Sequence, residues 1–240
     1  NSYSGGTNIN GGTLAISNAA ALGTSGTISF GGGTLKYVGI TTDLSNRFST
    51  AANQAIKIDT NGNNLTFASN LTSSGGSLTK SGSGTLTLAG SNAYTGGTNI
   101  NGGTLAISNS SALGSTGTIS FGGGTLQYNG ISTDLSSRFS TATNQAIKID
   151  TNGNNLTFAS SLTSSGGSLT KTGLGTLTLA GANSYSGGTT LNAGTLALSG
   201  SGTLGSGSVA VSGGTLGLGG KAISNTLGRV TGGRSEEHTS

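Results

Sequence analysis

The sequence has no cysteine, proline, methionine or tryptophan, and only 7% of its residues are charged. Without cysteine the chain has neither a disulfide framework nor a thiol nucleophile. Without proline, the 47 glycines cannot belong to a collagen-like triple helix. No apolar run reaches the roughly 18 residues that a membrane-spanning helix needs, so we expect no direct insertion of this segment into a membrane.

The few charges leave a small positive excess, with a formal net charge of +4. The basic residues are scattered singly along the chain and form no stripe, so we expect no nucleic-acid partner. Five lysines are expected to point outward into solvent, where they would also discourage pairing at sheet edges; they are Lys36, Lys57, Lys80, Lys148 and Lys171.

What remains is rich in Gly, Ser, Thr and Asn, and Leu, Ile, Val and Phe make up only about a fifth of the chain. Such a composition is also found in flexible linkers. The apolar residues recur here in a fixed pattern, however, which linkers lack. The sequence therefore predicts an ordered chain whose regular spacing compensates for a small apolar content.

An internal repeat of 91 residues organises the chain. The segment NSYSGGTNINGGTLAISN at residue 1 returns as NAYTGGTNINGGTLAISN at residue 92 and, more loosely, at residue 183. We predict two full units, residues 1–91 and 92–182, and a partial unit over residues 183–233. The aromatic residues keep the same register between units, as expected for rings that stack along a repetitive core.

Apolar residues alternate with polar ones over short stretches such as TLAIS, GTISF, AIKID and GTLTLAG. A period of two predicts strands with one buried face, and the Gly-Gly and Asn-Gly pairs between them predict tight turns. Such strands could form a sandwich, a barrel or a solenoid, but a sandwich does not predict so long a repeat. We therefore predict an all-β fold, a right-handed parallel β-helix (a solenoid) of roughly ten coils, with Asn, Thr and Ser ladders that pair polar groups between coils.

The segment TTDLSNRF departs from the strand pattern, because Asp43 and Arg47 are four residues apart, as are Leu44 and Phe48. This spacing predicts one short helical turn in each 91-residue repeat. We expect Thr42 to cap the turn, Asp43 to pair with Arg47, and the apolar pair to pack against the coils.

The last seven residues, RSEEHTS at 234–240, hold the only glutamates, Glu236 and Glu237, and the only histidine, His238. Their composition differs from that of the preceding 233 residues, which contain no glutamate and no histidine. They also resemble, letter for letter, the translation of a sequencing-library adapter. We interpret them as a non-native tail with few contacts and exclude them from reasoning about sites.

The remaining acids are Asp43, Asp59, Asp134 and Asp150. Glycoside hydrolysis needs two carboxylates roughly 5 to 10 Å apart, and a duplicated structural role is a better explanation for acids that recur at the repeat interval. The DTNGNN segments alternate acidic and amide oxygens, but their glycine and final residue do not fit a calcium loop. We expect no catalytic residue, no cofactor and no metal site; ligand-binding residues cannot be assigned.

The segment GxGTLTLAGxNxYxGGTxINGGTLAIS, at 82–108 and more loosely at 173–199, resembles the autotransporter-associated β-strand repeat, also called the passenger-associated transport repeat. The resemblance implies a β-helical passenger segment of a type V secretion protein, exported through the outer membrane to the cell surface or medium. It also implies a C-terminal translocator barrel in the full-length chain.

Two functions follow from this resemblance. One is a structural stalk that supports translocation and folding. The other is an adhesin or self-association surface for host glycans, matrix proteins or neighbouring cells. A β-helical carbohydrate-active enzyme is a remote third alternative.

Overall fold

Alternating apolar and polar residues form short parallel strands in the computed structural model of the protein. The structure describes residues 1–230 and 233–236. The chain divides into two compact units, residues 1–124 and 125–240. Each unit is a parallel β-solenoid, and the two together make about 11 turns. The prediction of an all-β solenoid with roughly ten coils is confirmed.

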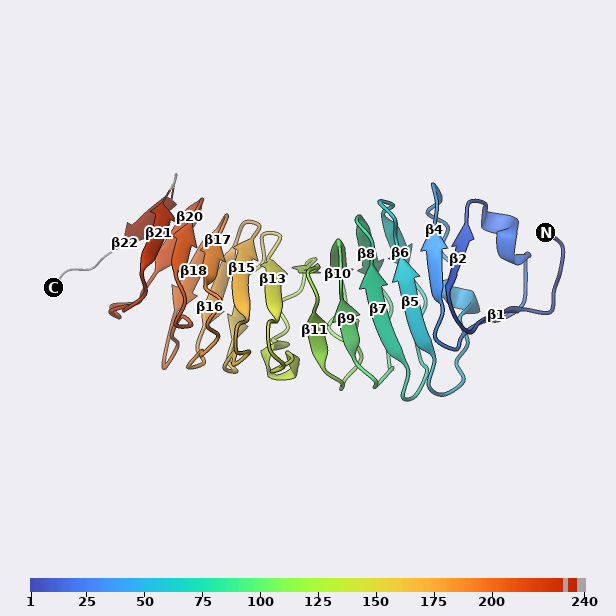
Figure 1. The fold of residues 1–240 in the computed structure, drawn as a ribbon, viewed down its shortest axis with the longest axis horizontal. Helices are drawn as coiled ribbons and strands as arrows, with labels where there is room; N and C mark the ends of the chain where they lie inside the picture. Colours follow the sequence, from blue (N-terminus) through green and yellow to red (C-terminus); the bar gives the residue numbers. More distant parts are fainter. Residues whose placement is uncertain (231–232, 237–240) are drawn as a thin grey trace. The chain divides into compact units, whose positions relative to one another are not determined.

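Unit 1 (residues 1–124) contains, in chain order, β1 (Thr7–Ile9), β2 (Thr13–Ile16), η1 (a 3-10 helix, Ala19–Leu22), β3 (Ile28–Phe30), β4 (Thr34–Tyr37), η2 (a 3-10 helix, Ser45–Arg47), β5 (Ala55–Asp59), β6 (Leu65–Phe67), β7 (Ser77–Ser81), β8 (Thr85–Leu88), β9 (Thr98–Ile100), β10 (Thr104–Ile107) and β11 (Ile119–Phe121). Strands β2, β4, β5, β7, β9 and β11 lie side by side in that order, as Figure 1 shows for β5, β7, β9 and β11. Strands β6, β8 and β10 form a second row.

Unit 2 (residues 125–240) contains β12 (Thr125–Tyr128), η3 (a 3-10 helix, Ser136–Arg138), β13 (Ala146–Asp150), β14 (Leu156–Phe158), β15 (Ser168–Thr172), β16 (Thr176–Leu179), β17 (Thr189–Leu191), β18 (Thr195–Leu198), β19 (Val209–Val211), β20 (Gly214–Gly217), β21 (Leu227–Val230) and β22 (Gly233–Glu236). Strands β12, β13, β15, β17, β19 and β21 pair in parallel in that order. Strands β14, β16, β18, β20 and β22 form the second row.

The core consists of columns of equivalent side chains from successive coils. Leu65, Leu86 and Leu105 are register partners on β6, β8 and β10, and all three are buried. Parallel in-register pairing places such side chains about 4.8 Å apart, so each coil covers the apolar face of its neighbour. This stacking explains how an apolar content of about a fifth suffices for a buried core.

Aromatic rings form one such column in unit 1. The rings of Phe30 and Phe48 lie 4.9 Å apart between centroids, and those of Phe48 and Phe67 lie 5.3 Å apart, both edge-to-face. Edge-to-face packing aligns the positive ring edge with the negative face of the next ring. The predicted stacking of aromatic residues along the core is confirmed in this column.

Asparagine side chains connect successive coils, as predicted. Asn64 Oδ1 accepts a hydrogen bond from the backbone N–H of Thr85 at 2.9 Å. Asn92 Oδ1 accepts from the N–H of Leu71, and its amide donates to the carbonyl of Ala112, 20 residues further on. The two bonds of Asn92 satisfy buried backbone groups that the strands leave unpaired.

The segment between β4 and β5 changes the order in which strands stack. Elsewhere in unit 1, two paired strands have one other strand between them in the sequence. Strand β5 instead pairs with β4, the strand directly before it in the sequence, and Thr34 lies opposite Lys57. The intervening chain makes one complete turn around the solenoid with η2 in place of strands, apart from a single bridge between Phe48 and Ile28. The sequence pattern did not predict this change.

The interpretation of residues 234–240 as an end with few contacts is wrong for residues 234–236. Their backbone belongs to β22, which pairs in parallel with β20 and places Arg234 opposite Thr215. An edge strand offers unpaired backbone N–H and C=O groups to any extended segment without proline, so composition does not prevent this pairing. Glu237 and His238 lie outside the described residues.

Candidate functional site

The carboxylate of Asp43 binds backbone groups on two coils. Its Oδ1 accepts from the N–H of Ser45 at 2.8 Å, and its Oδ2 accepts from the N–H of Ala68 at 2.9 Å. Asp134 makes the same two contacts in unit 2, at 2.8 and 2.9 Å. Both oxygens of each carboxylate therefore accept hydrogen bonds from the fold itself.

The carboxylates in the DTNGNN segments close turns of the backbone. Asp59 Oδ1 accepts from the N–H of Asn61 at 2.9 Å, and Asn61 has a φ of 46°, a conformation that asparagine tolerates better than most residues. The amide of Asn63 donates to the carbonyls of Tyr37 and Thr60. The turn thus uses its side-chain oxygens and amides internally.

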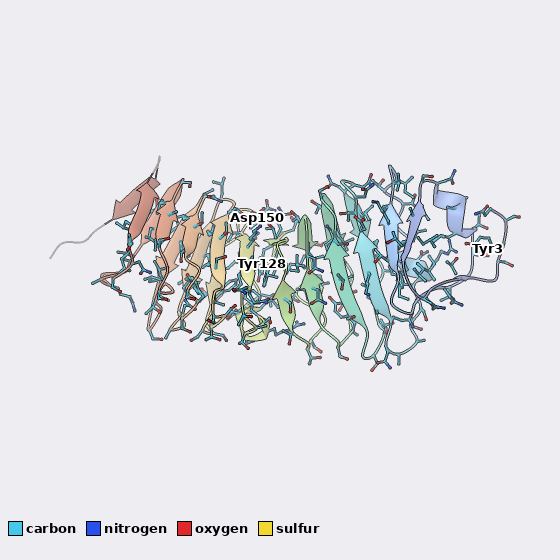
Figure 2. All side chains as sticks on the ribbon, viewed as in Figure 1. Tyr3, Tyr128 and Asp150 are labelled. Atoms are coloured by element: carbon cyan, nitrogen blue, oxygen red, sulfur yellow. The ribbon has the colours of Figure 1, made fainter. Side chains whose placement is uncertain are left out.

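The second carboxylate oxygen of the DTNGNN aspartate has a different partner in each unit. Asp59 Oδ2 lies 3.7 Å from Lys36 Nζ, whereas Asp150 Oδ2 accepts from Gln127 Nε2 at 2.7 Å. Figure 2 labels Asp150, which ends β13, and Tyr128, which ends β12. The substitution of lysine by glutamine between the units keeps a donor on the carboxylate and removes the charge.

The helical turn in TTDLSNRF is shorter than predicted and is capped differently. It is the three-residue 3-10 helix η2, and Asp43, rather than Thr42, accepts from its first N–H. Leu44 and Phe48 are buried, as predicted. A 3-10 helix has three residues per turn, so the α-helical spacing that would bring Asp43 and Arg47 together does not apply.

Arg47 has a different partner from the one predicted. Its guanidinium donates to the backbone carbonyls of the preceding coil, at 2.6–3.0 Å; they belong to Leu22, Gly23, Ser25 and Gly26. Five N–H donors in a rigid plane suit such a cluster of acceptors. The expected pairing of Asp43 with Arg47 is therefore wrong, because each side chain binds the backbone of a different coil.

Two of the five lysines predicted to point outward are buried. Lys80 and Lys171 each have an exposed fraction of 0%, whereas Lys36 retains 34% of its side-chain exposure. Lys57 and Lys148 are half-buried. The prediction of an outward orientation is wrong for the two buried residues.

Each buried ammonium binds three backbone carbonyl oxygens. Lys80 Nζ donates to Ser81, Gly82 and Gly102, each at 2.9 Å. We call this group the Lys80 site. The first two acceptors are the last residue of β7 and the residue that follows it, and the third belongs to the turn of the next coil.

Unit 2 repeats the arrangement. Lys171 Nζ donates to the carbonyls of Thr172, Gly173 and Ala193 at 2.9, 2.7 and 3.1 Å, and we call this group the Lys171 site. Three acceptors match the three N–H donors of an ammonium. Burial lowers the pKa of each lysine to about 8, and the negative charge of Asp59 or Asp150 opposes that shift.

The strand period of the sequence indicates that these two lysines are buried, although lysine is usually exposed. In SLTKS, Leu78 and Lys80 are two positions apart, so the strand period that buries the leucine also buries the lysine. The two lysines are also unchanged between the units, whereas Lys36 becomes Gln127.

Comparison with known proteins identifies the segments that hold these sites. The passenger-associated-transport-repeat family model matches residues 1–16, 78–107 and 169–198. The chain carries passenger-associated transport repeats. The second and third matches contain the Lys80 site and the Lys171 site.

A related protein points the same way. Over 109 residues the chain is 40% identical to a protein named "Adhesin BmaC autotransporter" from Brucella suis biovar 1 (strain 1330). The match covers 41% of this chain and 3% of that protein, so the chain spans a small part of the relative's length. No solved structure matches. The chain is a repeat region of an autotransporter passenger, and it is secreted or exposed at the cell surface.

A surface hollow lies beside the third transport repeat, and several of its polar side chains also bind the backbone. It is lined in part by Leu204, Lys221 and Asn225. The amide of Asn225 donates to the carbonyls of Gly205 and Gly207, and the ammonium of Lys221 donates to a further carbonyl. The amide and the ammonium in the hollow are therefore both engaged by the fold.

Over the described residues, no group of three or more His, Cys, Asp or Glu side chains is placed to hold a metal ion. The same residues include no helix with the length and apolar content needed to cross a bilayer. Glu237 and His238, the other candidate ligands, are not among them.

Proposed function

We propose that this passenger segment is a structural stalk whose coil-by-coil stacking supports export and holds a more distal part of the protein away from the cell. The repeated use of the same contacts in both units carries the proposal. Asp43 and Asp134, like Lys80 and Lys171, bind equivalent backbone groups at nearly equal distances. A spacer needs such repetition, whereas a catalytic site does not.

The energetics of a solenoid fit this role. Each coil contacts its neighbours, so stability grows by roughly the same amount with each coil that is added. A chain that emerges from the outer membrane can therefore fold progressively, and each folded coil opposes backward movement. A C-terminal translocator in the full-length protein would supply the pore.

The same contacts support a non-enzymatic role. The carboxylates of Asp43, Asp59, Asp134 and Asp150 accept hydrogen bonds from turn backbone. Hydrolysis by a carboxylate pair requires one group that is free to transfer a proton to the substrate.

An adhesive surface is the second candidate, and the name of the Brucella relative favours it. Host glycans, matrix proteins or a neighbouring copy of the chain would then contact the outward Ser, Thr and Asn side chains. Under this alternative each 91-residue unit adds binding sites, so avidity depends on the number of units.

Deletion of residues 92–182 from the full-length protein separates the two candidates. The new junction joins Ser91 to Asn183, and the segment NSYSGGT replaces the closely similar NAYTGGT, so the coil register is preserved. A stalk loses about four coils, roughly 19 Å of length, and keeps its adhesion. If the unit is adhesive, its deletion instead lowers the number of cells that bind to the target surface.

A control deletion of residues 92–136 removes about half a unit and breaks the register. We expect poor surface display from this variant if stacking supports export. Equal display of the wild type and both deletions, measured by surface protease accessibility, would contradict the proposed role in export.

A further inference from the structure

A charged side chain occupies a column of apolar residues in each unit. In unit 1, Lys80 is the register partner of Ile58 on one side and Ile100 on the other. Lys171 has the equivalent place in unit 2, between an isoleucine and a leucine. A leucine or isoleucine would complete the column at no cost in desolvation, so the lysine requires another explanation.

The apolar pattern alone does not define how successive coils align. Inward residues occur at every second position, as with Leu86 and Leu88 in TLTL. A strand that slips by one residue turns its apolar side chains outward, but a strand that slips by two keeps them inward. Short strands with nearly uniform sequences therefore have competing registers.

The Lys80 site distinguishes these registers. The carbonyl of Gly102 belongs to the neighbouring coil, and a slip of two residues would move it by about 6 to 7 Å along the strand. The buried ammonium would then keep only the acceptors of its own coil, Ser81 and Gly82. A buried cation that lacks a hydrogen-bond acceptor is strongly unfavourable, so the slipped arrangement is penalised.

We infer that Lys80 and Lys171 are register-setting residues, which align two successive coils within the second and third matched transport repeats. They increase the free-energy difference between the native register and the slipped registers. Removal of the charge should therefore leave the apolar columns and the β-structure in place while it allows a second alignment. Buried polar groups set the register of coiled coils by the same physical principle.

Cysteine crosslinking tests the alignment, because the chain has no cysteine of its own. Thr79 and Asn99 are register partners on β7 and β9, and the amide of Asn99 reaches toward the hydroxyl of Thr79 at 3.5 Å. A Thr79→Cys, Asn99→Cys pair reports the native register, with Cα atoms about 5 Å apart. A Thr79→Cys, Asn101→Cys pair reports a slip of two residues, since its Cα atoms are about 8 Å apart in the native register, beyond disulfide reach.

Each cysteine pair is combined with Lys80→Met and, as a matched control, with Lys57→Met. Lys57 is half-buried and donates to one carbonyl, that of Gly32 at 2.7 Å. We expect Lys80→Met to raise the ratio of slipped to native crosslink at least tenfold, with retained β circular dichroism. Lys57→Met should leave the ratio unchanged, and Lys80→Arg, which keeps a charged donor group, should return it toward the wild-type value.

Two results would overturn the inference. An unchanged ratio in Lys80→Met would show that other contacts, such as the close approach of Gly103 to the turn at Gly82, fix the register without the lysine. Loss of β-structure in Lys80→Met would show that the lysine holds the fold together and does not select its alignment. The Lys171 site provides an independent repetition, with Thr170 paired to Thr190 in the native register.

Discussion

The four buried tyrosines provide a test in which residue type and burial are constant and the hydrogen bond varies. Tyr37, Tyr94, Tyr128 and Tyr185 are all 0% exposed. The hydroxyls of Tyr94 and Tyr185 bond to threonine Oγ1 atoms at 2.7 and 2.6 Å. Within the described residues, the hydroxyls of Tyr37 and Tyr128 have no hydrogen-bond partner. Replacement of each tyrosine by phenylalanine removes one hydroxyl and keeps the ring.

The two kinds of tyrosine should respond with opposite signs. A buried polar group without a partner costs about 1–3 kcal/mol, so Tyr37→Phe and Tyr128→Phe should stabilise the fold by about 1 kcal/mol each. Tyr185→Phe removes a hydrogen bond and leaves the buried hydroxyl of Thr189 without its partner, so it should destabilise the fold by about 1–2 kcal/mol. The difference between the two classes is therefore about 2–3 kcal/mol.

Equilibrium denaturation in urea measures these differences in the whole chain. Hydrogen exchange around each tyrosine adds a local measurement, which is needed because coils of a solenoid can open separately. A loss of stability in Tyr37→Phe as large as that in Tyr185→Phe would refute the reasoning. The hydroxyl of Tyr37 would then make a favourable interaction that the fold does not reveal.

Three further predictions concern the backbone, the helical turn and the buried lysines. An added Cβ at Gly103 would overlap the carbonyl oxygens of Gly82 and Gly84 on the preceding coil. Gly12, its counterpart in the first repeat, has a similar φ and no atom near the added Cβ. Gly103→Ala should therefore lower the free energy of unfolding, measured in urea, by about 1–3 kcal/mol more than Gly12→Ala does. Leu44→Asp places a carboxylate at a buried position and should lower stability by about 3 kcal/mol; an unchanged melting temperature would contradict the packing of this turn. The pKa of Lys80 and Lys171 falls to about 8, below the unfolded value of 10.5, so the unfolded chain binds more protons above pH 8. Denaturation midpoints should therefore rise between pH 7.5 and about 9.5, and the rise should vanish in the Lys80→Met, Lys171→Met double variant.

The repetitive part of the fold follows from the sequence because it depends on local spacing. Alternation places Leu86 and Ile56 inward, and the 91-residue repeat excludes folds in which equivalent segments have different surroundings. The coil-connecting role of asparagine also follows, since turns leave backbone groups unpaired and asparagine can both donate and accept. These features require no knowledge of contacts between distant residues.

The helical turn could be predicted only in part, because its partners are distant in sequence. The burial of Leu44 and Phe48 follows from their apolar character, but the acceptors of Arg47 belong to a coil more than 20 residues earlier. The unpaired hydroxyl of Tyr37 likewise depends on which atoms the neighbouring coils bring near it. A single repeat gives no signal for such contacts.

The burial of Lys80 and Lys171 was missed for a different reason, since the strand period in SLTKS already indicates it. A charged residue was expected to face water because burial of an unpaired ion is costly. In a parallel solenoid, however, the turns of successive coils bring carbonyl oxygens together. Such a cluster of carbonyl dipoles can accept every N–H of an ammonium without an acidic partner.

This arrangement changes what the net charge of +4 means. Arg47, Lys57, Lys80 and Lys171 all direct their charged groups at backbone carbonyls, and the carbonyl oxygens carry the opposing partial charge. A surface field that attracts phosphates requires cations directed toward solvent. The positive excess is therefore partly internal to the fold, which supports the expectation that nucleic acid is not a partner. Because the acceptors of Arg47, Lys80 and Lys171 include atoms of a neighbouring coil, these cations connect successive coils of the solenoid.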